Sequence, residues 1–154
     1  MSYTTKQLTA ETWADFAGLV EAHNGVWGGC WCMGFHPEGV GPGHTATGNR
    51  EAKRAHTMAG TVHQILVYTD DQCVGWCQYG TPAELPNINN RKKYELTAHD
   101  APVWRIGCIF TAGKHRGQGV ARRRAVHAGP GGAAMSEPSG RQCDIAFRAC
   151  EETT

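Results

Sequence analysis

The chain of 154 residues has the length of one domain and can bury a hydrophobic core without disulfides or a metal ion. Its 15 Lys and Arg nearly balance its 14 Asp and Glu, so a net charge of +1 gives no overall field that selects nucleic acid or an anionic membrane. No segment has the ~18 apolar residues of a membrane span, and the first residues lack a secretory signal, which together predict a cytoplasmic protein.

The N-terminal third predicts two helices joined by a long loop. Residues 9–25 carry apolar side chains at the spacing of one helical face, Trp13, Phe16, Ala17 and Val20. Residues 25–48 are too rich in glycine and aromatic residues for a regular element, so we expect a loop that lines another part of the molecule. Asn49 is then expected to cap a second helix, which ends at Gly60.

The side chains of this loop leave two interpretations open. Trp27, Cys30, Trp31 and Cys32 could fold over a small hydrophobic cluster or line a pocket for an acceptor substrate. Zinc is disfavoured, because Cys-x-Cys lacks the usual ligand spacing even with His36 nearby, and we expect no metal. The seven cysteines are odd in number and irregularly spaced, which favours reduced thiols, most of them in the core.

The middle of the chain predicts a hairpin and a buried strand. Residues 63–69 and 73–80 have strand composition and are separated by Asp70 and Asp71, which is typical of an antiparallel hairpin. The polar segment 81–102 predicts a loop with a short helix at 91–96. The apolar run 103–110 is typical of a strand covered on both faces, and alternation groups its core residues as Trp104, Ile106, Cys108 and Phe110. This order of elements indicates an α/β fold.

Residues 111–121 form a glycine-rich turn between that strand and a predicted helix. Backbone N–H groups can converge on an anion there, and the helix dipole favours negative charge. Gly117 and Gly119 permit backbone angles and close approach that a side chain would block. The segment is neither a P-loop, since no Gly-Lys-Ser/Thr follows, nor a dinucleotide fingerprint, since the third glycine is missing. The alternative is a turn that only ends the strand.

The strand and turn resemble motif A of the GCN5-related N-acetyltransferases, which is written Gln/Arg-x-x-Gly-x-Gly/Ala. The matching residues are the strand 104–110 and the run Lys114-His115-Arg116-Gly117-Gln118-Gly119-Val120-Ala121. The resemblance covers about residues 9–121 and implies a mixed sheet with flanking helices. It also implies a transferase that moves acetyl from acetyl-CoA to an amine of a small molecule or protein by direct attack.

The resemblance further implies where the cosubstrate binds. Pantetheine would pair with the strand at Ile109, Phe110 and Thr111, as an added strand does. The pyrophosphate would lie on the loop residues Arg116, Gly117, Gln118, Gly119, Val120 and Ala121.

The family pattern stops after Ala121. Arg122-Arg123-Arg124 stand where the family helix turns apolar residues toward its sheet, and Gly/Pro-rich sequence follows. We therefore predict an acetyltransferase-like domain at 1–125 and an irregular tail at 126–154, with the C-terminal strands incomplete through truncation or a frameshift. No tyrosine after Tyr94 could supply the family's usual general acid, so a catalytically defective CoA-binding domain is the alternative function.

Acetyl transfer needs a neutral amine and therefore a base within reach. The candidates are Glu84, His99 and Asp100, although loop residues of these types are more often solvated than catalytic. A nucleic-acid module built on residues 122–124 is disfavoured, because no aromatic stacking residues stand near the arginines. The expected partner is an amine-bearing acceptor, and the sequence does not indicate an oligomeric state.

Overall fold

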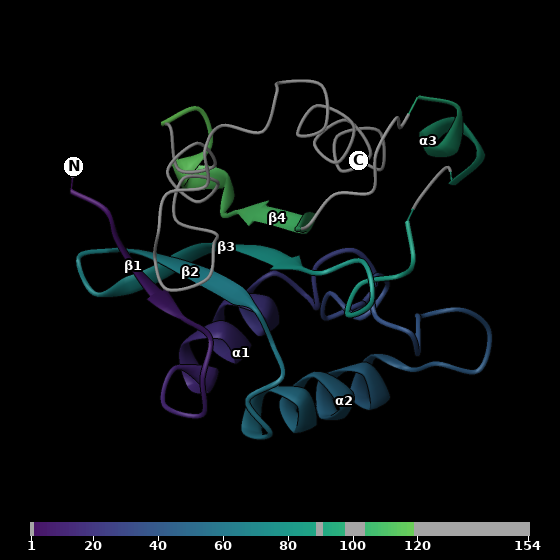
Figure 1. Ribbon diagram of the computed structural model, residues 1–154. Helices are drawn as coiled ribbons and strands as arrows, with labels where there is room; N and C mark the ends of the chain where they lie inside the picture. The colour runs from purple at the N-terminus through teal and green to yellow at the C-terminus, as the bar shows by residue number, and fades with distance from the viewer. Residues whose placement is uncertain (1, 89–90, 98–103, 119–154) are drawn as a thin grey trace.

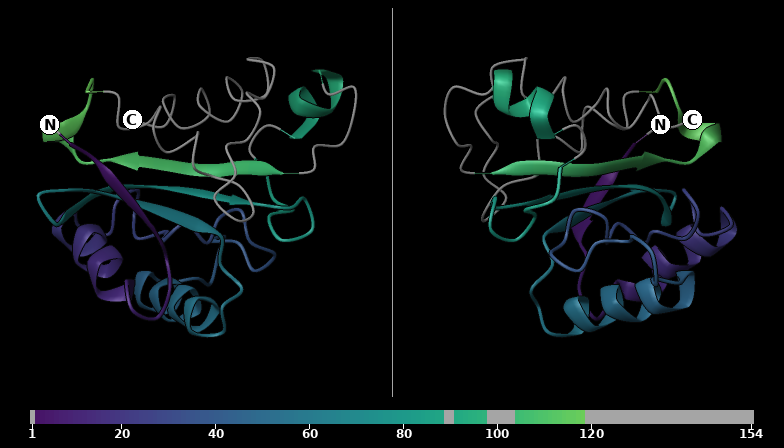
Figure 2. Two further views of the ribbon diagram at one scale, coloured as in Figure 1. Left: turned by 60° about the vertical axis from the view of Figure 1, so that its left-hand side comes forward. Right: turned by 90° about the vertical axis from the view of Figure 1, so that its right-hand side faces the viewer.

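The computed structural model of this chain describes residues 2–88, 91–97 and 104–118. Within these ranges four antiparallel strands form one sheet in the order β1-β2-β3-β4. Helices α1 and α2 cover one face, and α3 lies on the opposite side (Figures 1 and 2). In chain order the elements are β1 (Thr4–Gln7), α1 (Trp13–Ala22), α2 (Ala46–Met58), β2 (Gln64–Thr69), β3 (Gln72–Gly80), α3 (Arg91–Thr97), β4 (Arg105–Thr111) and a 3₁₀ turn (Gly113–His115).

Helix α1 confirms the first predicted helix and packs its apolar stripe on the sheet. All four predicted side chains are buried, and Leu19 is buried with them. Phe16 meets Trp76 of β3 edge to face, with 5.2 Å between ring centroids. The helix begins at Trp13 because Thr12 is engaged in a turn, where its hydroxyl accepts from the N–H of Thr9 and donates to the carbonyl of Gln7.

Helix α2 begins earlier than predicted, and its cap is a different residue. The Thr45 hydroxyl accepts a hydrogen bond from the N–H of Gly48 at 3.0 Å, so Thr45 is the N-cap and the prediction for Asn49 is wrong. Asn49 is instead buried inside the helix, where its amide donates to the carbonyl of Gly29 at 3.0 Å. The predicted end is confirmed by Gly60, which has a left-handed φ of 72°.

The β2–β3 hairpin and the short helix α3 are confirmed. Asp70 and Asp71 have φ values of 49° and 60°, as a tight two-residue hairpin turn requires. The sequence missed β1, which pairs with β2 along its whole length. Three of its four residues are exposed, so it carries no hydrophobic pattern that would predict a strand.

Strand β4 is where predicted, but a β-bulge divides its side chains between two faces. Gln78 of β3 lies opposite Cys108, whereas the next residue, Tyr79, lies opposite Ile106, so Gly107 is the extra residue. Cys108 and Phe110 share a core face, as predicted, and pack with residues of α1, but Ile106 packs with Tyr79 on the other face. Trp104 joins that second cluster, so its predicted grouping with Cys108 is also wrong. The bulge reverses the alternation, which sequence spacing alone does not reveal.

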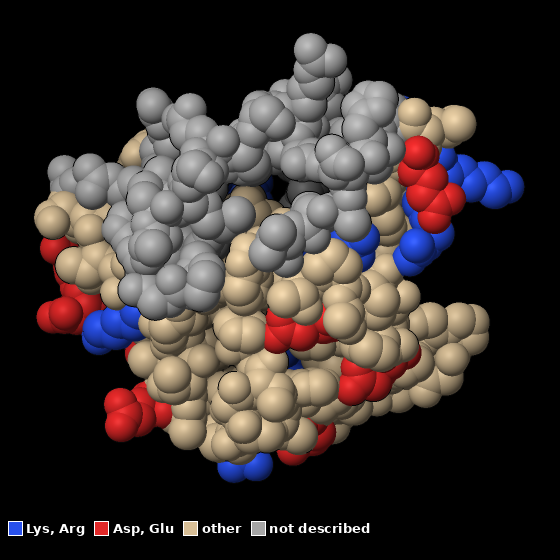
Figure 3. Space-filling model, viewed as in Figure 1, with Lys and Arg blue, Asp and Glu red and all other residues tan. Residues whose placement is uncertain are grey.

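The remaining predictions concern membrane spans, surface charge and residues near the C-terminus. No helix in the described ranges is long and apolar enough to cross a membrane. Acidic and basic side chains are interspersed on the face seen in Figure 3, in line with the small net charge. Several predictions lie outside the described residues: His99, Asp100, Gly119, Val120, Ala121, the arginines 122–124 and the tail 126–154.

Lys53 of α2 is a charged residue in the core of this fold. Its side chain is completely buried, and its Nζ has no hydrogen-bond partner within the part of the chain that the structure describes. Burial lowers the pKa of Lys53 to about 8, against a partial opposing effect of the nearby Cys32, Cys108 and Cys30. Cys32 accepts a hydrogen bond from the indole N–H of Trp76 at 3.1 Å.

We predict that Lys53→Met raises the free energy of unfolding at pH 7 by about 2 kcal/mol, because it removes an unpaired buried ammonium. Between about pH 8 and pH 10.5 the unfolded chain binds more protons at Lys53 than the folded chain does, so the stability of wild type rises with pH across this window. The stability difference between Lys53→Met and wild type shrinks accordingly. Urea unfolding at several pH values measures both effects. Arg54→Met, an exposed neighbour on α2, is the control and should change little. A destabilised Lys53→Met would instead indicate a productive ion pair with Cys32.

Candidate functional site

The loop after β4 is a folded turn. The N–H groups of His115 and Arg116 donate to the carbonyls of Ala112 and Gly113, at 2.9 and 3.3 Å. The Arg116 side chain returns to β4, where its Nε donates to the carbonyl of Thr111 at 3.2 Å. Gly117 follows with a φ of 74°, the left-handed conformation that its place in the motif predicts.

Gln118 fixes the far side of the same loop. Its amide donates to the carbonyl of Lys114 at 3.2 Å, and its Oε1 accepts from the hydroxyl of Tyr3 at 2.8 Å. Tyr3 immediately precedes β1, so this hydrogen bond ties the loop to the segment before the first strand. Of the six residues expected to bind pyrophosphate, the structure describes Arg116, Gly117 and Gln118.

The bulge at Gly107 is a point of close packing between three segments. A Cβ at this position would lie 3.1 Å from Oε1 of Gln78, 3.3 Å from Leu85 and 3.4 Å from Phe35. Gln78 uses its amide to donate to the carbonyl of Cys32 at 2.9 Å, which anchors the α1–α2 loop to β3. Only glycine allows the loop, β3 and β4 to approach this closely.

Glu84 is the candidate base that the structure describes, and both of its oxygens are engaged. Oε1 lies 2.6 Å from Nδ1 of His63, and Oε2 accepts from the N–H of Thr81 at 2.7 Å. Burial raises the pKa of Glu84, but the hydrogen bonds from Thr81 and the nearby His63 outweigh it and hold the pKa below its usual value. The carboxylate is thus ionised and lies close beside the imidazole, but the contact does not have hydrogen-bond geometry at Nδ1 of His63. Its role as a base stays a prediction.

His63 is a candidate that sequence reasoning missed. Its ring lies between aromatic neighbours, 5.5 Å from Tyr79 and 5.6 Å from Trp104 between centroids. Trp104 immediately precedes β4, so this contact places His63 near the start of that strand, two residue pairs away from the bulge at Gly107. In the sequence His63 stands just before the hairpin and Glu84 just after it. No sequence pattern indicates that the loop after β3 brings Glu84 close to His63.

The aromatic loop between α1 and α2 supports the cluster interpretation for its buried residues. Trp31 and Cys32 belong to the core, with Trp31 stacked on Trp13 at 5.9 Å, and Trp27 packs on Phe110 at 6.0 Å. Trp31 also lines an open cavity of about 530 Å³ between α1 and α2, together with Glu21, Asn24, Gly25, Gly28, Gly29, Ala46, Thr47 and Arg50. An open pocket lined by polar residues and the aromatic Trp31 therefore lies beside the same loop.

Known structures share this arrangement of elements. Neither a protein-family profile nor a curated protein sequence matches this chain. It is similar in structure to the aminoglycoside N-acetyltransferase AAC(6')-Iy in complex with CoA, with a TM-score of 0.54 and 14% identity over 96% of this chain and 86% of that one. A second structure of that enzyme, with the bisubstrate analog CoA-S-monomethyl-acetylneamine, has a TM-score of 0.51 and 14% identity over 80% and 67% of the two chains. At this identity the likeness establishes the fold alone.

We predict that Gly107→Ala lowers the free energy of unfolding by about 1–3 kcal/mol, because the new methyl group crowds Gln78, Leu85 and Phe35. Chemical denaturation measures the change. Gly41→Ala is the matched control, since its Cβ would meet no atom within 4 Å and its φ is not positive. Equal effects of the two substitutions would show that the bulge is loosely packed.

Proposed function

Because the chain has the fold of the GCN5-related N-acetyltransferases, we propose that it binds acetyl-CoA and transfers the acetyl group to an amine of a small molecule or protein. One observation carries the proposal: β4 is interrupted at Gly107 and leads into a folded loop with a left-handed Gly117. This is the strand and turn that the motif assigns to the cosubstrate. A structural neighbour with the same fold was crystallised with CoA.

The proposed cosubstrate site follows β4 into the loop. The pantetheine arm would lie along Ile109, Phe110 and Thr111, in the manner of an added strand. Phosphate oxygens would meet the loop from Arg116 onward, where Lys114 and Arg116 are exposed and supply positive charge without a nearby acid in the sequence. Only glycine at 117 lets the turn keep its conformation at no steric cost.

For the chemical step we propose His63 as general base and Glu84 as the residue that stabilises its protonated form. The neutral amine attacks the thioester carbonyl, the C–S bond breaks, and CoA leaves as a thiolate that takes up a proton. The attacking nitrogen gives up one proton, which the imidazole of His63 accepts. Glu84 is suited to stabilise the imidazolium by its charge, because its carboxylate lies 2.6 Å from Nδ1.

The proposal is tested with the whole chain, by calorimetric titration with acetyl-CoA and by release of CoA thiol over a panel of amines. Binding together with amine-dependent thiol release supports the transferase. Binding without release over a broad panel favours the alternative, a CoA-binding domain that lacks activity. A chain that binds neither acetyl-CoA nor CoA contradicts both.

We predict that Gly117→Ala weakens acetyl-CoA binding about tenfold, because an alanine in the left-handed conformation costs roughly 1–2 kcal/mol and shifts the loop amides. Calorimetry measures the dissociation constant. Gly60→Ala is the matched control, with a φ of 72° and equally open surroundings but far from β4 in the sequence. It should lose stability to the same extent and keep its affinity. Equal affinity losses would mean that only stability had changed.

We predict that His63→Asn lowers kcat by about 10²-fold or more while acetyl-CoA affinity stays unchanged, because only the proton acceptor is lost. Steady-state kinetics with the best amine of the panel measures kcat, and calorimetry measures the affinity. Glu84→Gln should lower kcat less, since the imidazole remains but loses the neighbouring negative charge. Unchanged kcat in His63→Asn would remove His63 from the mechanism.

A further inference from the structure

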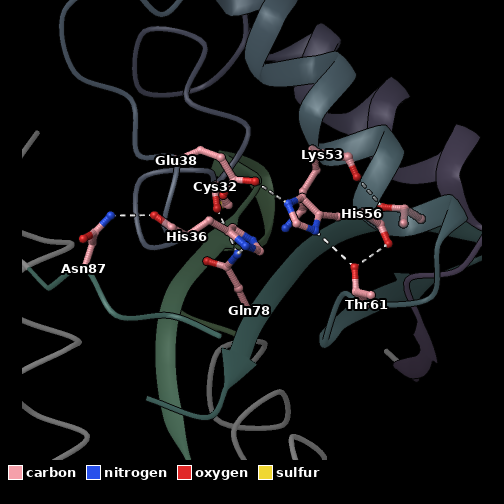
Figure 4. A network of polar contacts seen from close by, with 9 residues as sticks. Cys32, His36, Glu38, Lys53, His56, Thr61, Gln78 and Asn87 are labelled. Carbon is pink, nitrogen blue, oxygen red and sulfur yellow. Dashed lines mark hydrogen bonds and ion pairs between the residues drawn. The ribbon is translucent and has the colours of Figure 1, made fainter. Parts of the chain in front are cut away.

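Three side chains from α2 and the loop before it converge outside the proposed transferase site. His36 and Glu38 come from the α1–α2 loop and His56 from α2, and their ligand-type atoms all lie within 4.8 Å of one another (Figure 4). Two imidazoles and one carboxylate are a common ligand set for Zn²⁺ that leaves a fourth position for water. We propose that His36, Glu38 and His56 bind a Zn²⁺ ion.

The hydrogen bonds of His56 leave Nε2 as its metal-binding atom. The hydroxyl of Thr61 donates its one proton to the carbonyl of His56 at 3.1 Å, so its oxygen must accept from Nδ1–H of the ring, also at 3.1 Å. Nε2 then faces Oε1 of Glu38 at 2.8 Å. Zinc-bound histidines typically donate their other N–H to such a partner, so Thr61 already holds the ring in the tautomer that a metal requires.

Gln78 fixes the state of His36 in a similar way. Its amide nitrogen donates to the carbonyl of Cys32, which identifies that atom as nitrogen, and it lies 3.0 Å from Nε2 of His36. Nε2 therefore accepts, and the ring is neutral. No described residue hydrogen-bonds to Nδ1 of His36, and Oε1 of the buried Gln78 also lacks a partner there. If zinc displaces the Nδ1 proton, Nε2 becomes the N–H, and Gln78 must turn its Oε1 toward the ring and give up its donation to Cys32.

The three ligand atoms lie within 4.8 Å of one another and must approach further to bind one ion. In a tetrahedral site with bonds of about 2.0–2.1 Å, ligand atoms lie about 3.3 Å apart. The Glu38–His56 pair, at 2.8 Å, is already closer than that. Glu38 is 45% exposed, so its side chain can adjust without disturbing the core. The ion would tie the loop to α2.

The positive charge of Lys53 should weaken zinc binding, so substitutions at Lys53 and Glu38 should change the affinity in opposite directions. It lies buried on α2, one turn before His56, and its charge acts on His36. A dication at the cluster is repelled by this ammonium, while the carboxylate of Glu38 attracts it. Removing the charge of Lys53 should therefore tighten zinc binding, whereas removing the charge of Glu38 should weaken it.

The experiment titrates the whole chain, carrying no polyhistidine tag, with Zn²⁺ by calorimetry and with Co²⁺ by visible absorption. We expect one equivalent bound, with the absorption of a four-coordinate site. Glu38→Gln and His56→Gln should weaken Zn²⁺ binding at least tenfold, and Thr61→Val about tenfold through loss of the orienting hydrogen bond. His44→Gln, an exposed histidine of the same loop, is the control and should bind as wild type does.

Several outcomes would overturn the site. One is the absence of stoichiometric binding, and another is Glu38→Gln and His56→Gln binding as tightly as His44→Gln. A sulfur-to-cobalt charge-transfer band would assign the metal to Cys30 and Cys32 instead. Since His56→Gln could perturb folding, Glu38→Gln carries the test at an exposed position, and Zn²⁺ should raise the Tm of wild type but not of Glu38→Gln. None of these readouts depends on acetyl transfer.

Discussion

The pairing of β3 with β4 around Gly107 is the constraint on which both faces of this sheet depend. One extra residue lets a single strand send Phe110 toward the helices and Ile106 toward the opposite face. The missing side chain at Gly107 also leaves room for Gln78, which reaches across to the α1–α2 loop. A β-bulge that re-aims side chains and terminates regular pairing is typical of strands beside functional sites.

The aromatic core holds that strand in place. Phe110 stacks on Trp76 with 4.6 Å between centroids, and Trp76 in turn meets Phe16 of α1. Phe110 is the middle residue of the segment proposed to receive pantetheine, Ile109 to Thr111. Its packing on Trp76 therefore makes this segment part of the packed core. A strand supported in this way keeps its geometry without help from a ligand.

A polar layer lies between the loop and α2, beside this apolar core. Gln78 and His36 share a hydrogen bond, His36 stacks on His56 at 4.9 Å, and Lys53 is enclosed nearby. Burying these groups costs free energy unless each is satisfied, and Lys53 and Gln78 retain atoms without partners in the described part. The α1–α2 loop is thus held by specific polar contacts as well as by Trp31, and the proposed zinc ion would add to them.

The sequence by itself determined the features that depend on local chemistry. The apolar stripe of α1, the Asp70-Asp71 turn and the left-handed Gly117 each follow from a few neighbouring residues, and the structure has all three. The tertiary structure alone decided features that depend on distant partners. Strand β1 exists because β2 pairs with it, and the bulge and the His63–Glu84 pair join residues that no sequence period connects. Local patterns encode propensity and spacing, whereas register and side-chain pairing are settled only when the chain packs against itself.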